Sequence, residues 1–325
     1  MRRLRPVRPS PQTGPDGVLV VDKPRGITSH DAVARCRRIL GTRRVGHVGT
    51  LDPIATGVLP LVVGRSTRLA MLLSEGNKVY HSIFRLGVVT DTYDTTGTVV
   101  ADGMRQERSV PSAPDAIEAV SRRFVGTFTQ FPPPYSAKKI DGIRAYRLAR
   151  RQEVVAPKPV KGTVHQFEIE SLKDDRLTCR IICAPGFYVR SLAHDLGQAL
   201  GCGACLEDLR REQSSAFSLD HAVTMDQLER DHGSAMRHLV PMSELLPNLR
   251  SVVVTERGAR LTAHGNALTP TEFEPSSAAV SVGIASPSLE EASSGKVKVY
   301  DRSGSLLAIA ESSTAGILHP RIVLV

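Results

Sequence analysis

The sequence contains no long hydrophobic run. Hydrophobic residues make up 41% of its 325 residues, yet no segment approaches the ~18 continuous apolar residues of a membrane span. The start, MRRLRPVRPSPQTGPDG, is basic and proline-rich but lacks the apolar stretch and cleavage site of a secretory signal. An organelle transit peptide is a minor alternative, because the segment is short and not amphipathic. We expect a soluble, cytoplasmic protein without membrane contact, in which residues 1–15 form a flexible basic arm.

Cysteine is also scarce. The five cysteines are an odd number, in a chain too large to need disulfide bonds for stability, and this fits a reducing compartment. Four of them, Cys179, Cys183, Cys202 and Cys205, have a spacing compatible with zinc ligands. The first two, however, fall in the apolar run LTCRIICA, where cysteine is usually a small buried hydrophobic residue. We therefore expect no metal site.

Basic residues exceed acidic ones in only one part of the chain. Residues 251–325 hold 6 Lys and Arg against 7 Asp and Glu, whereas residues 1–250 hold 36 against 26, a net charge of +10. A basic surface attracts polyanions by releasing condensed counterions, which makes nucleic acid the favoured class of partner. A solvated charged surface without a partner is the alternative.

Acidic residues are nearly absent from residues 46–64, GHVGTLDPIATGVLPLVVG, where Asp52 is the single acid. The segment has no lysine, which excludes a phosphate-binding P-loop. His47 and Asp52 alone make a weak metal site. Glycosidase chemistry needs a second acid, and the candidates Asp91 and Asp94 lie in a polar segment typical of turns. No Gly-x-Ser-x-Gly elbow indicates a serine triad.

One chemical interpretation of Asp52 remains after these exclusions. A single carboxylate on a glycine-framed loop can act as a nucleophile or base at a glycosidic centre. From spacing alone, an Asp-Pro turn in a surface loop is the simpler interpretation. The residues by themselves leave both open.

Hydrophobic periodicity predicts a mixture of strands and helices. Helices are expected after Thr28, after Ser112, in the basic segment that follows FPPPYSAKK, in GFYVRSLAHDLGQALG and in TERGARLTAHG. Strands are expected at residues 18–21, on both sides of the polar turn in KVYHSIFRLGVVTDTYDTTGTVV, around Asp174-Asp175 and in KVKVYDRSGSLLAIA. The absence of strict βαβ alternation favours the α+β class, and the length predicts two units.

Four separated segments resemble, in order and spacing, the TruB family of bacterial tRNA pseudouridine-55 synthases. They are GHVGTLDPIATGVLPLVVGRSTRL, KVYHSIFRLG with TDTYDTTG, FPPPYSAKKIDGIRAYRLAR, and GFYVRSLAHDLGQALG with LRRE. The resemblance implies a pseudouridine synthase fold, with a central mixed, largely antiparallel sheet flanked by helices and loops. It implies a catalytic domain at 16–250 with an RNA-gripping insertion at about 131–155. A small PUA-like RNA-binding β domain at 251–325, with a mobile loop at about 270–295, would follow.

The resemblance also implies an activity and three catalytic residues. The reaction would isomerise uridine to pseudouridine at position 55 in the T-loop of tRNA, by base flipping and without a cofactor. Asp52 matches the catalytic aspartate of the family, and its step is attack on C1′, attack on the base, or removal of a 2′ proton. Arg190 matches the arginine that pairs with this aspartate, and a neighbouring guanidinium favours an ionised carboxylate. Tyr80 matches the tyrosine that stacks on the target base.

The remaining expectations concern substrate binding and partners. His47 matches a histidine that holds the everted loop, and Leu209 an apolar residue of the uracil pocket. The full set of expected substrate-binding residues is His47, Leu209, Lys23, Tyr188, Lys138 and Lys139. The expected partner is the T-stem-loop of tRNA, with the protein acting as a monomer that needs no protein partner. An RNA chaperone and a sugar-active hydrolase are the alternative functions.

Overall fold

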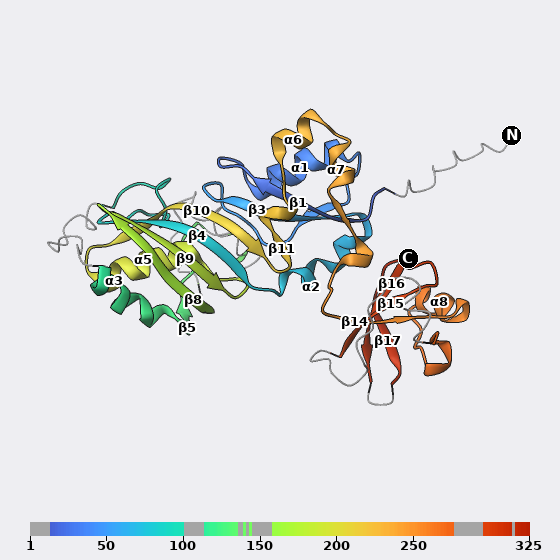
Figure 1. The fold of residues 1–325 in the computed structure, drawn as a ribbon. Helices are drawn as coiled ribbons and strands as arrows, with labels where there is room; N and C mark the ends of the chain where they lie inside the picture. Colours follow the sequence, from blue (N-terminus) through green and yellow to red (C-terminus); the bar gives the residue numbers. More distant parts are fainter. Residues whose placement is uncertain are drawn as a thin grey trace.

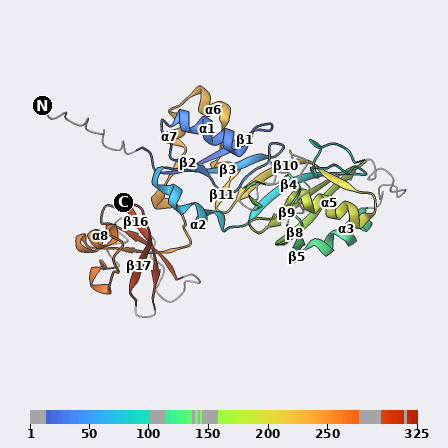
Figure 2. The same cartoon turned by 180° about the vertical axis from the view of Figure 1, so that it is seen from behind.

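The computed structural model describes residues 14–100, 114–135, 139–140, 143–144, 158–275, 295–313 and 316–325 (Figure 1). Most of the expected basic arm at 1–15 lies outside these residues, as do most of the expected insertion at about 131–155 and most of the expected loop at about 270–295. The described residues form one long sheet and a separate C-terminal sheet, which lie apart in both views (Figures 1 and 2).

The main sheet is mixed and largely antiparallel. In spatial order its strands are β12 (Val223–Thr224), β1 (Gly17–Lys23), β3 (Thr56–Val63), β10 (Ala204–Ser214), β4 (Lys78–Leu86), β9 (Arg176–Cys183), β8 (Val160–Lys173) and β5 (Gly126–Gln130). Short strands β2 (Val45–His47), β11 (Phe217–Ser218) and β13 (Leu239–Pro241) pair with β3, β10 and β1. Only the pairs β1–β12 and β3–β10 of this sheet are parallel in the described residues. The expected α+β class is confirmed.

Helices cover the two ends of the main sheet. The α-helices are α1 (Ser29–Ile39), α2 (Ala70–Ser74), α3 (Pro114–Ser121), α5 (Val189–Leu200), α6 (Met225–Arg230), α7 (Ser234–Arg237) and α8 (Glu256–Ala263). Short 3₁₀ helices are η1 (Gly64–Leu69), η3 (Arg122–Phe124), η4 (Leu219–His221), η5 (Met242–Glu244) and η6 (Pro270–Glu272). In both views α1, α6 and α7 gather at the β1 end, and α3 and α5 lie near β8 and β9 (Figures 1 and 2).

Local signals in the sequence place several elements correctly. The capping box of Thr28 and Asp31 begins α1, and Gly41 with φ 62° follows the helix end. Strands β8 and β9 flank Asp174 and Asp175 as expected. The apolar side of α5 packs into the core, and Gly197 permits this, because a Cβ there would lie 2.0 Å from the amide nitrogen of Ala204.

One sequence-based prediction of secondary structure is wrong. The segment KVYHSIFRLGVVTDTYDTTGTVV was expected to form two strands, but only β4 forms, and residues 87–100 are turns with isolated bridges at Thr90–Val99 and Asp94–Leu206. Both edges of β4 are already occupied by strands β9 and β10, so the following segment has no edge on which to pair.

The basic helix expected after FPPPYSAKK is untested, because most of its residues lie outside the described ones. At its beginning the structure has a small hairpin of β6 (Lys139–Ile140) and β7 (Ile143–Arg144). Asp-Gly between two apolar residues is a strong hairpin signal. The remainder of this segment, through residue 157, lies outside the described residues.

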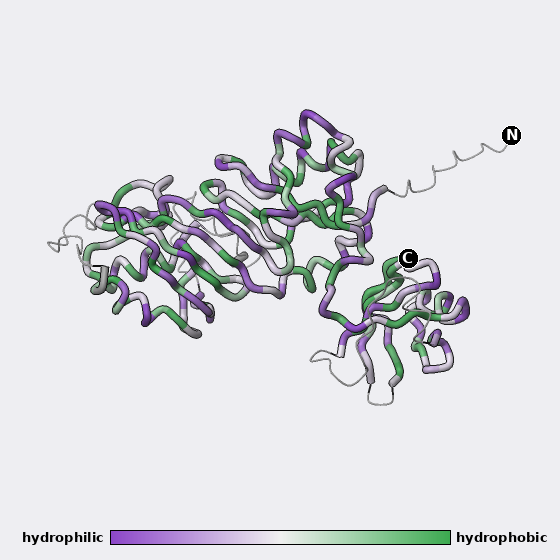
Figure 3. The backbone as a smooth tube through the Cα atoms, in the orientation of Figure 1, coloured by the Kyte–Doolittle hydropathy of each residue, from purple (hydrophilic) through white to green (hydrophobic). Residues whose placement is uncertain are grey.

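The C-terminal sheet consists of β14 (Arg250–Val253), β15 (Lys296–Tyr300), β16 (Leu306–Ser312) and β17 (Leu318–Val323), and the expected hairpin is formed by β15 and β16. Figure 3 shows hydrophobic segments in the strands of both sheets and hydrophilic ones in many loops. A shared cluster joins the two units: Val18, Val62 and Leu73 pack with Tyr300 and Ile309. The Tyr300 hydroxyl donates to Ser243 O at 2.7 Å, which ties the C-terminal sheet to the unit that contains the main sheet.

Candidate active site

A cavity of about 260 Å³ opens beside the centre of the main sheet. Four chain segments form it: the loop after β2, strand β4, strand β10 and the turn between β9 and α5. The lining residues are Gly49, Thr50, Leu51, Asp52, Lys78, Tyr80, Ala184, Gly186, Phe187, Tyr188, Val189, Arg190, Leu209 and Arg211.

Strand pairing places one wall of the cavity. Tyr80 on β4 lies opposite Arg211 on β10, and alternate residues of a strand point to the same face. Lys78 and Tyr80 therefore share a face with Leu209 and Arg211. Tyr80, Leu209 and Arg211 are buried, at 7%, 6% and 1% exposure. This wall is rigid, because it belongs to central strands of the sheet.

The loop that carries Asp52 is held by its neighbours on both sides. The Ser29 hydroxyl donates to Leu51 O at 3.0 Å and accepts from Leu51 N at 2.8 Å. Leu51 and Ile54 are each 3% exposed and anchor the loop in the core. The side chain of Asp52, by contrast, is 37% exposed at the mouth of the cavity. The loop thus presents one carboxylate from a fixed backbone.

Arg190 connects Asp52 to the rest of the site. Its Nε lies 2.9 Å from Asp52 Oδ2, although only 7% of the arginine side chain is exposed. Its other nitrogens donate to Thr92 O at 3.0 Å and to Tyr135 O at 2.9 Å. A cation in the first turn of a helix is opposed by the helix dipole, so these acceptors are needed to hold it there.

A second carboxylate shares Arg190, which corrects the interpretation of Asp94 as a turn residue. Asp94 Oδ2 lies 3.3 Å from Arg190 Nη1, and Asp94 is 4% exposed. Its Oδ1 accepts from Thr92 Oγ1 at 2.9 Å and from Thr96 N at 3.0 Å. Asp94 does organise a turn, but the same side chain is also a buried ion-pair partner of the site. Asp91, in contrast, accepts from Thr98 N at 2.8 Å and is not among the residues that line the cavity.

Burial shifts the pKa values of several groups around the cavity. Desolvation lowers the pKa of Lys78 to about 8, and Arg211 adds to this shift. Lys78 Nζ donates to Ser74 O at 3.1 Å and Gly76 O at 2.5 Å. Desolvation raises the pKa of Tyr80, while the nearby charge of Arg211 opposes the rise. The phenol of Tyr80 is therefore neutral at pH 7.

Arg211 is a site residue that the sequence interpretation did not single out. Its Nε donates to Val58 O at 2.7 Å and its Nη2 to Gly49 O at 3.0 Å. These two carbonyls belong to opposite sides of the loop that carries Asp52, so Arg211 ties that loop to β10 beneath Tyr80. Lys78 and Phe187 were also missed. For Lys78 the available signal was its spacing of two residues from Tyr80 on a strand, which marks a shared face without identifying a cavity. For Phe187 the available signal was only that it precedes Tyr188.

The structure brings five of the expected site residues into one cavity: Asp52, Tyr80, Tyr188, Arg190 and Leu209. Tyr188 precedes α5, and Gln130 binds both its N and its O, at 3.1 and 3.2 Å. Desolvation raises the pKa of the Tyr188 phenol, and the charge of Asp52 adds to the rise.

Other expected site residues do not line this cavity. Lys23 is fully buried and donates to Pro24 O at 2.9 Å and Ile27 O at 2.8 Å. Desolvation lowers its pKa to about 8 although Asp52 opposes the shift, so Lys23 lies near Asp52 behind the wall. His47 lies on β2 opposite Leu61 and is likewise not part of the lining. Lys138 lies outside the described residues, and Lys139 is placed in β6 by its backbone only.

The cysteines do not form a metal centre in the described part of the chain. Cys36, Cys179, Cys183, Cys202 and Cys205 are buried free thiols, whose pKa values are raised mainly by desolvation. Over the described ranges, no three His, Cys, Asp or Glu side chains are grouped to hold a metal ion. No helix among these residues is long and apolar enough to cross a membrane.

Comparison with known proteins identifies the family. The family model described as TruB family pseudouridylate synthase (N terminal domain) matches residues 37–189, and that of the tRNA pseudouridylate synthase B C-terminal domain matches residues 190–247. The tRNA pseudouridine synthase B of Solibacter usitatus is 42% identical over 95% of this chain and 100% of that protein. That of Stutzerimonas stutzeri is 36% identical over 94% of each.

The chain belongs to the TruB family. Solved structures agree at the level of the fold. The archaeal box H/ACA sRNP Nop10–Cbf5 complex contains a chain with a TM-score of 0.65 and 24% identity, covering 95% of this chain and 86% of that one. A chain of an H/ACA RNP bound to a substrate RNA containing 2′-deoxyuridine has a TM-score of 0.67 and 22% identity, covering 98% and 92%. Both confirm the fold expected of a TruB-family chain.

Proposed function

We propose that this TruB-family protein isomerises uridine to pseudouridine at position 55 in the T-loop of tRNA. The observation that carries the proposal is Asp52, which lies at the mouth of the cavity 2.9 Å from the buried Arg190 and faces a wall formed by Tyr80 and Leu209. The names of its relatives, tRNA pseudouridine synthase B, support tRNA as the substrate class.

The proposed reaction breaks the C1′–N1 bond of uridine and forms a C1′–C5 bond. The proton on C5 is released and N1 gains one, so the product is an isomer and no co-reactant is consumed. One ionised carboxylate beside the reacting sugar and base is sufficient for this chemistry. Arg190 keeps Asp52 in position, because its Nε lies 2.9 Å from Asp52 Oδ2.

The cavity accepts a single base that has left the RNA stack. Enzymes that act on a base inside a folded nucleic acid extrude it, at a cost of a few kcal/mol. The apolar surfaces of Tyr80, Leu209 and Phe187 line the cavity and offset part of this cost by stacking and burial. Tyr188 and Arg190 close the opposite side. We assign Asp52, Tyr80 and Arg190 the catalytic roles on this basis.

The proposal extends to the organisation of the chain. Residues 16–250 would form the catalytic domain, with an RNA-gripping insertion at about 131–155 that includes Lys138 and Lys139. Lys23 and His47 would support the loop around Asp52 from outside the cavity. Residues 251–325 would form a PUA-like RNA-binding domain. The protein would act as a monomer in the cytoplasm on the T-stem-loop.

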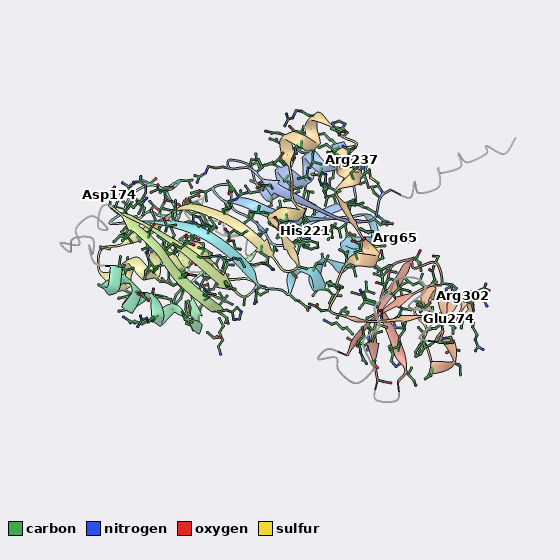
Figure 4. The ribbon with its side chains drawn as sticks, viewed as in Figure 1. Arg65, Asp174, His221, Arg237, Glu274 and Arg302 are labelled. Carbon is green, nitrogen blue, oxygen red and sulfur yellow. The ribbon has the colours of Figure 1, made fainter. Side chains whose placement is uncertain are left out.

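The test is release of tritium from C5-labelled uridine in tRNA. Wild-type protein should release one equivalent, and tRNA with cytidine at position 55 should release none. Asp52→Asn should lower the rate by at least about 10³-fold while tRNA affinity is kept. The matched control is Asp174→Asn, because Asp174 is an exposed acid at the β8–β9 turn, far from the C-terminal sheet (Figure 4). Full activity of Asp52→Asn would refute the assigned mechanism.

A further inference from the structure

Two aromatic rings stack next to the site without touching the cavity. Tyr93 and His194 have ring centroids 3.9 Å apart and an interplanar angle of 9°. Tyr93 belongs to the turn after β4 and His194 to α5, so the stack joins two distant segments of the chain. Neither residue is among those that line the cavity. Any effect of the pair on the reaction must therefore pass through another residue.

That residue is Arg190. It precedes His194 by one helical turn, so the two side chains leave the same side of α5. Arg190 Nη1 donates to Thr92 O at 3.0 Å and contacts Asp94 Oδ2 at 3.3 Å. Side chains of α5 thus hold three consecutive residues of the turn. The Arg190 guanidinium holds residues 92 and 94, and the His194 imidazole holds residue 93.

The backbone of Tyr93 shows that this turn needs such support. Its φ is 63°, a left-handed conformation that bulky residues rarely adopt. Its N donates to Thr90 O at 3.3 Å, and its O accepts from Leu206 N at 2.9 Å. A glycine would adopt this φ without strain, so the tyrosine ring must contribute something that compensates for it.

We propose that the Tyr93–His194 stack is a positioning pair, which locks the turn of residues 90–97 onto α5 so that Arg190 holds Asp52 in its reactive orientation. The inference rests on the proposed function. It predicts that loss of either ring slows the chemical step and leaves the binding of tRNA unchanged, because no phosphate- or base-binding group is removed.

The surroundings of His194 favour the uncharged form of its imidazole ring. Burial lowers its pKa, and its Nδ1 is buried without a hydrogen-bond partner among the described residues. Asp195, the next residue, has a pKa raised to about 6 by burial. Desolvation raises the pKa of Tyr93, and the charge of Asp195 adds to the rise, so Asp195 also lies near the stack. A phenyl ring should therefore replace the imidazole with little change in the stack.

The experiment compares His194→Ala, His194→Phe, Tyr93→Gly and Tyr93→Phe with wild type. Single-turnover tritium release at saturating tRNA measures the chemical step, and filter binding measures tRNA affinity. His194→Ala and Tyr93→Gly should slow the step about tenfold, as expected for loss of one aromatic pair. Both Phe variants should stay within about twofold of wild type, and all affinities should be unchanged. Gln198→Ala, an exposed position on α5, is the matched control.

Several outcomes would overturn the inference. Equal rates in all variants would do so, and so would a His194→Phe variant as slow as His194→Ala. Should His194→Ala not fold, Tyr93→Gly decides the matter, because glycine adopts φ 63° without strain while the substitution removes the side chain that carries the ring. Absence of tritium release from wild type would refute the proposed function, and this inference with it. The rate of tritium release by wild type therefore distinguishes failure of the proposed function from failure of this inference alone.

Discussion

Two cavities in the described part of the chain differ in size and in the burial of their charged groups. The active-site cavity is about 260 Å³, and a second cavity of about 630 Å³ lies where the main sheet meets the segment leading to the C-terminal sheet. The larger one is lined mainly by apolar residues, and its two ionisable groups, His221 and Glu244, are exposed. In the smaller one, Lys78, Arg190 and Arg211 are all buried.

The difference teaches that buried charge, and not volume, marks the functional cavity. Taking a charged group out of water is unfavourable unless partners compensate it. The three cationic side chains buried around the 260 Å³ cavity each donate hydrogen bonds to specific backbone carbonyl oxygens. The larger cavity has no such arrangement, because its two ionisable groups are exposed to water.

The comparison is tested most strongly at Arg190. Arg190→Met should lower the rate of pseudouridine formation by about 10³-fold or more, because Asp52 loses the group that orients it. It should also lower the free energy of unfolding by about 3–5 kcal/mol, because Asp94 stays buried without its cation. Tritium release and urea unfolding measure the two effects.

A double variant separates these two effects. Adding Asp94→Asn to Arg190→Met removes the stranded charge and should recover part of the stability. The activity should not return, since Asp52 remains without its partner. Recovery of activity in the double variant would contradict the role given to Arg190.

The second prediction concerns the pH dependence of Lys78. Its pKa is 10.5 when unfolded and about 8 when folded, so between these values the unfolded chain binds more protons. The stability of wild type should therefore rise relative to Lys78→Met as pH increases from 8 to 10.5, by about 3 kcal/mol in total. Urea unfolding at a series of pH values measures it. The exposed Lys173→Met is the control and should show no such trend.

The smallest effects are expected from an alanine-to-leucine substitution in each cavity, which adds the same side-chain atoms to both. Ala184→Leu adds three carbons to the active-site cavity and should lower kcat/KM about tenfold or more, because the flipped base is displaced. Ala216→Leu adds them to the larger cavity, and kcat/KM should stay within about twofold. A tenfold loss in Ala216→Leu would break the comparison and assign a role in the reaction to the larger cavity.

The wrong prediction of a second strand after β4 shows which information local sequence signals lack. Helix α1 and the β8–β9 turn were predicted because Thr28, Asp31 and the Asp174-Asp175 pair act through their immediate neighbours. The strand expected after β4 failed because strand formation depends on a free sheet edge. Which strands occupy an edge is decided by segments far away in the chain, here β9 and β10.

The site divides in the same way. The sequence alone determined that Asp52 is the single acid of a glycine-framed loop and that Arg190 lies in the first turn of a helix with an apolar side. Only the tertiary structure decided that Arg190 is buried, that it serves both Asp52 and Asp94, and that Arg211 and Lys78 join the same cavity. The physical reason is that periodicity and capping are local, whereas the burial and pairing of a charge depend on which distant segments pack against it.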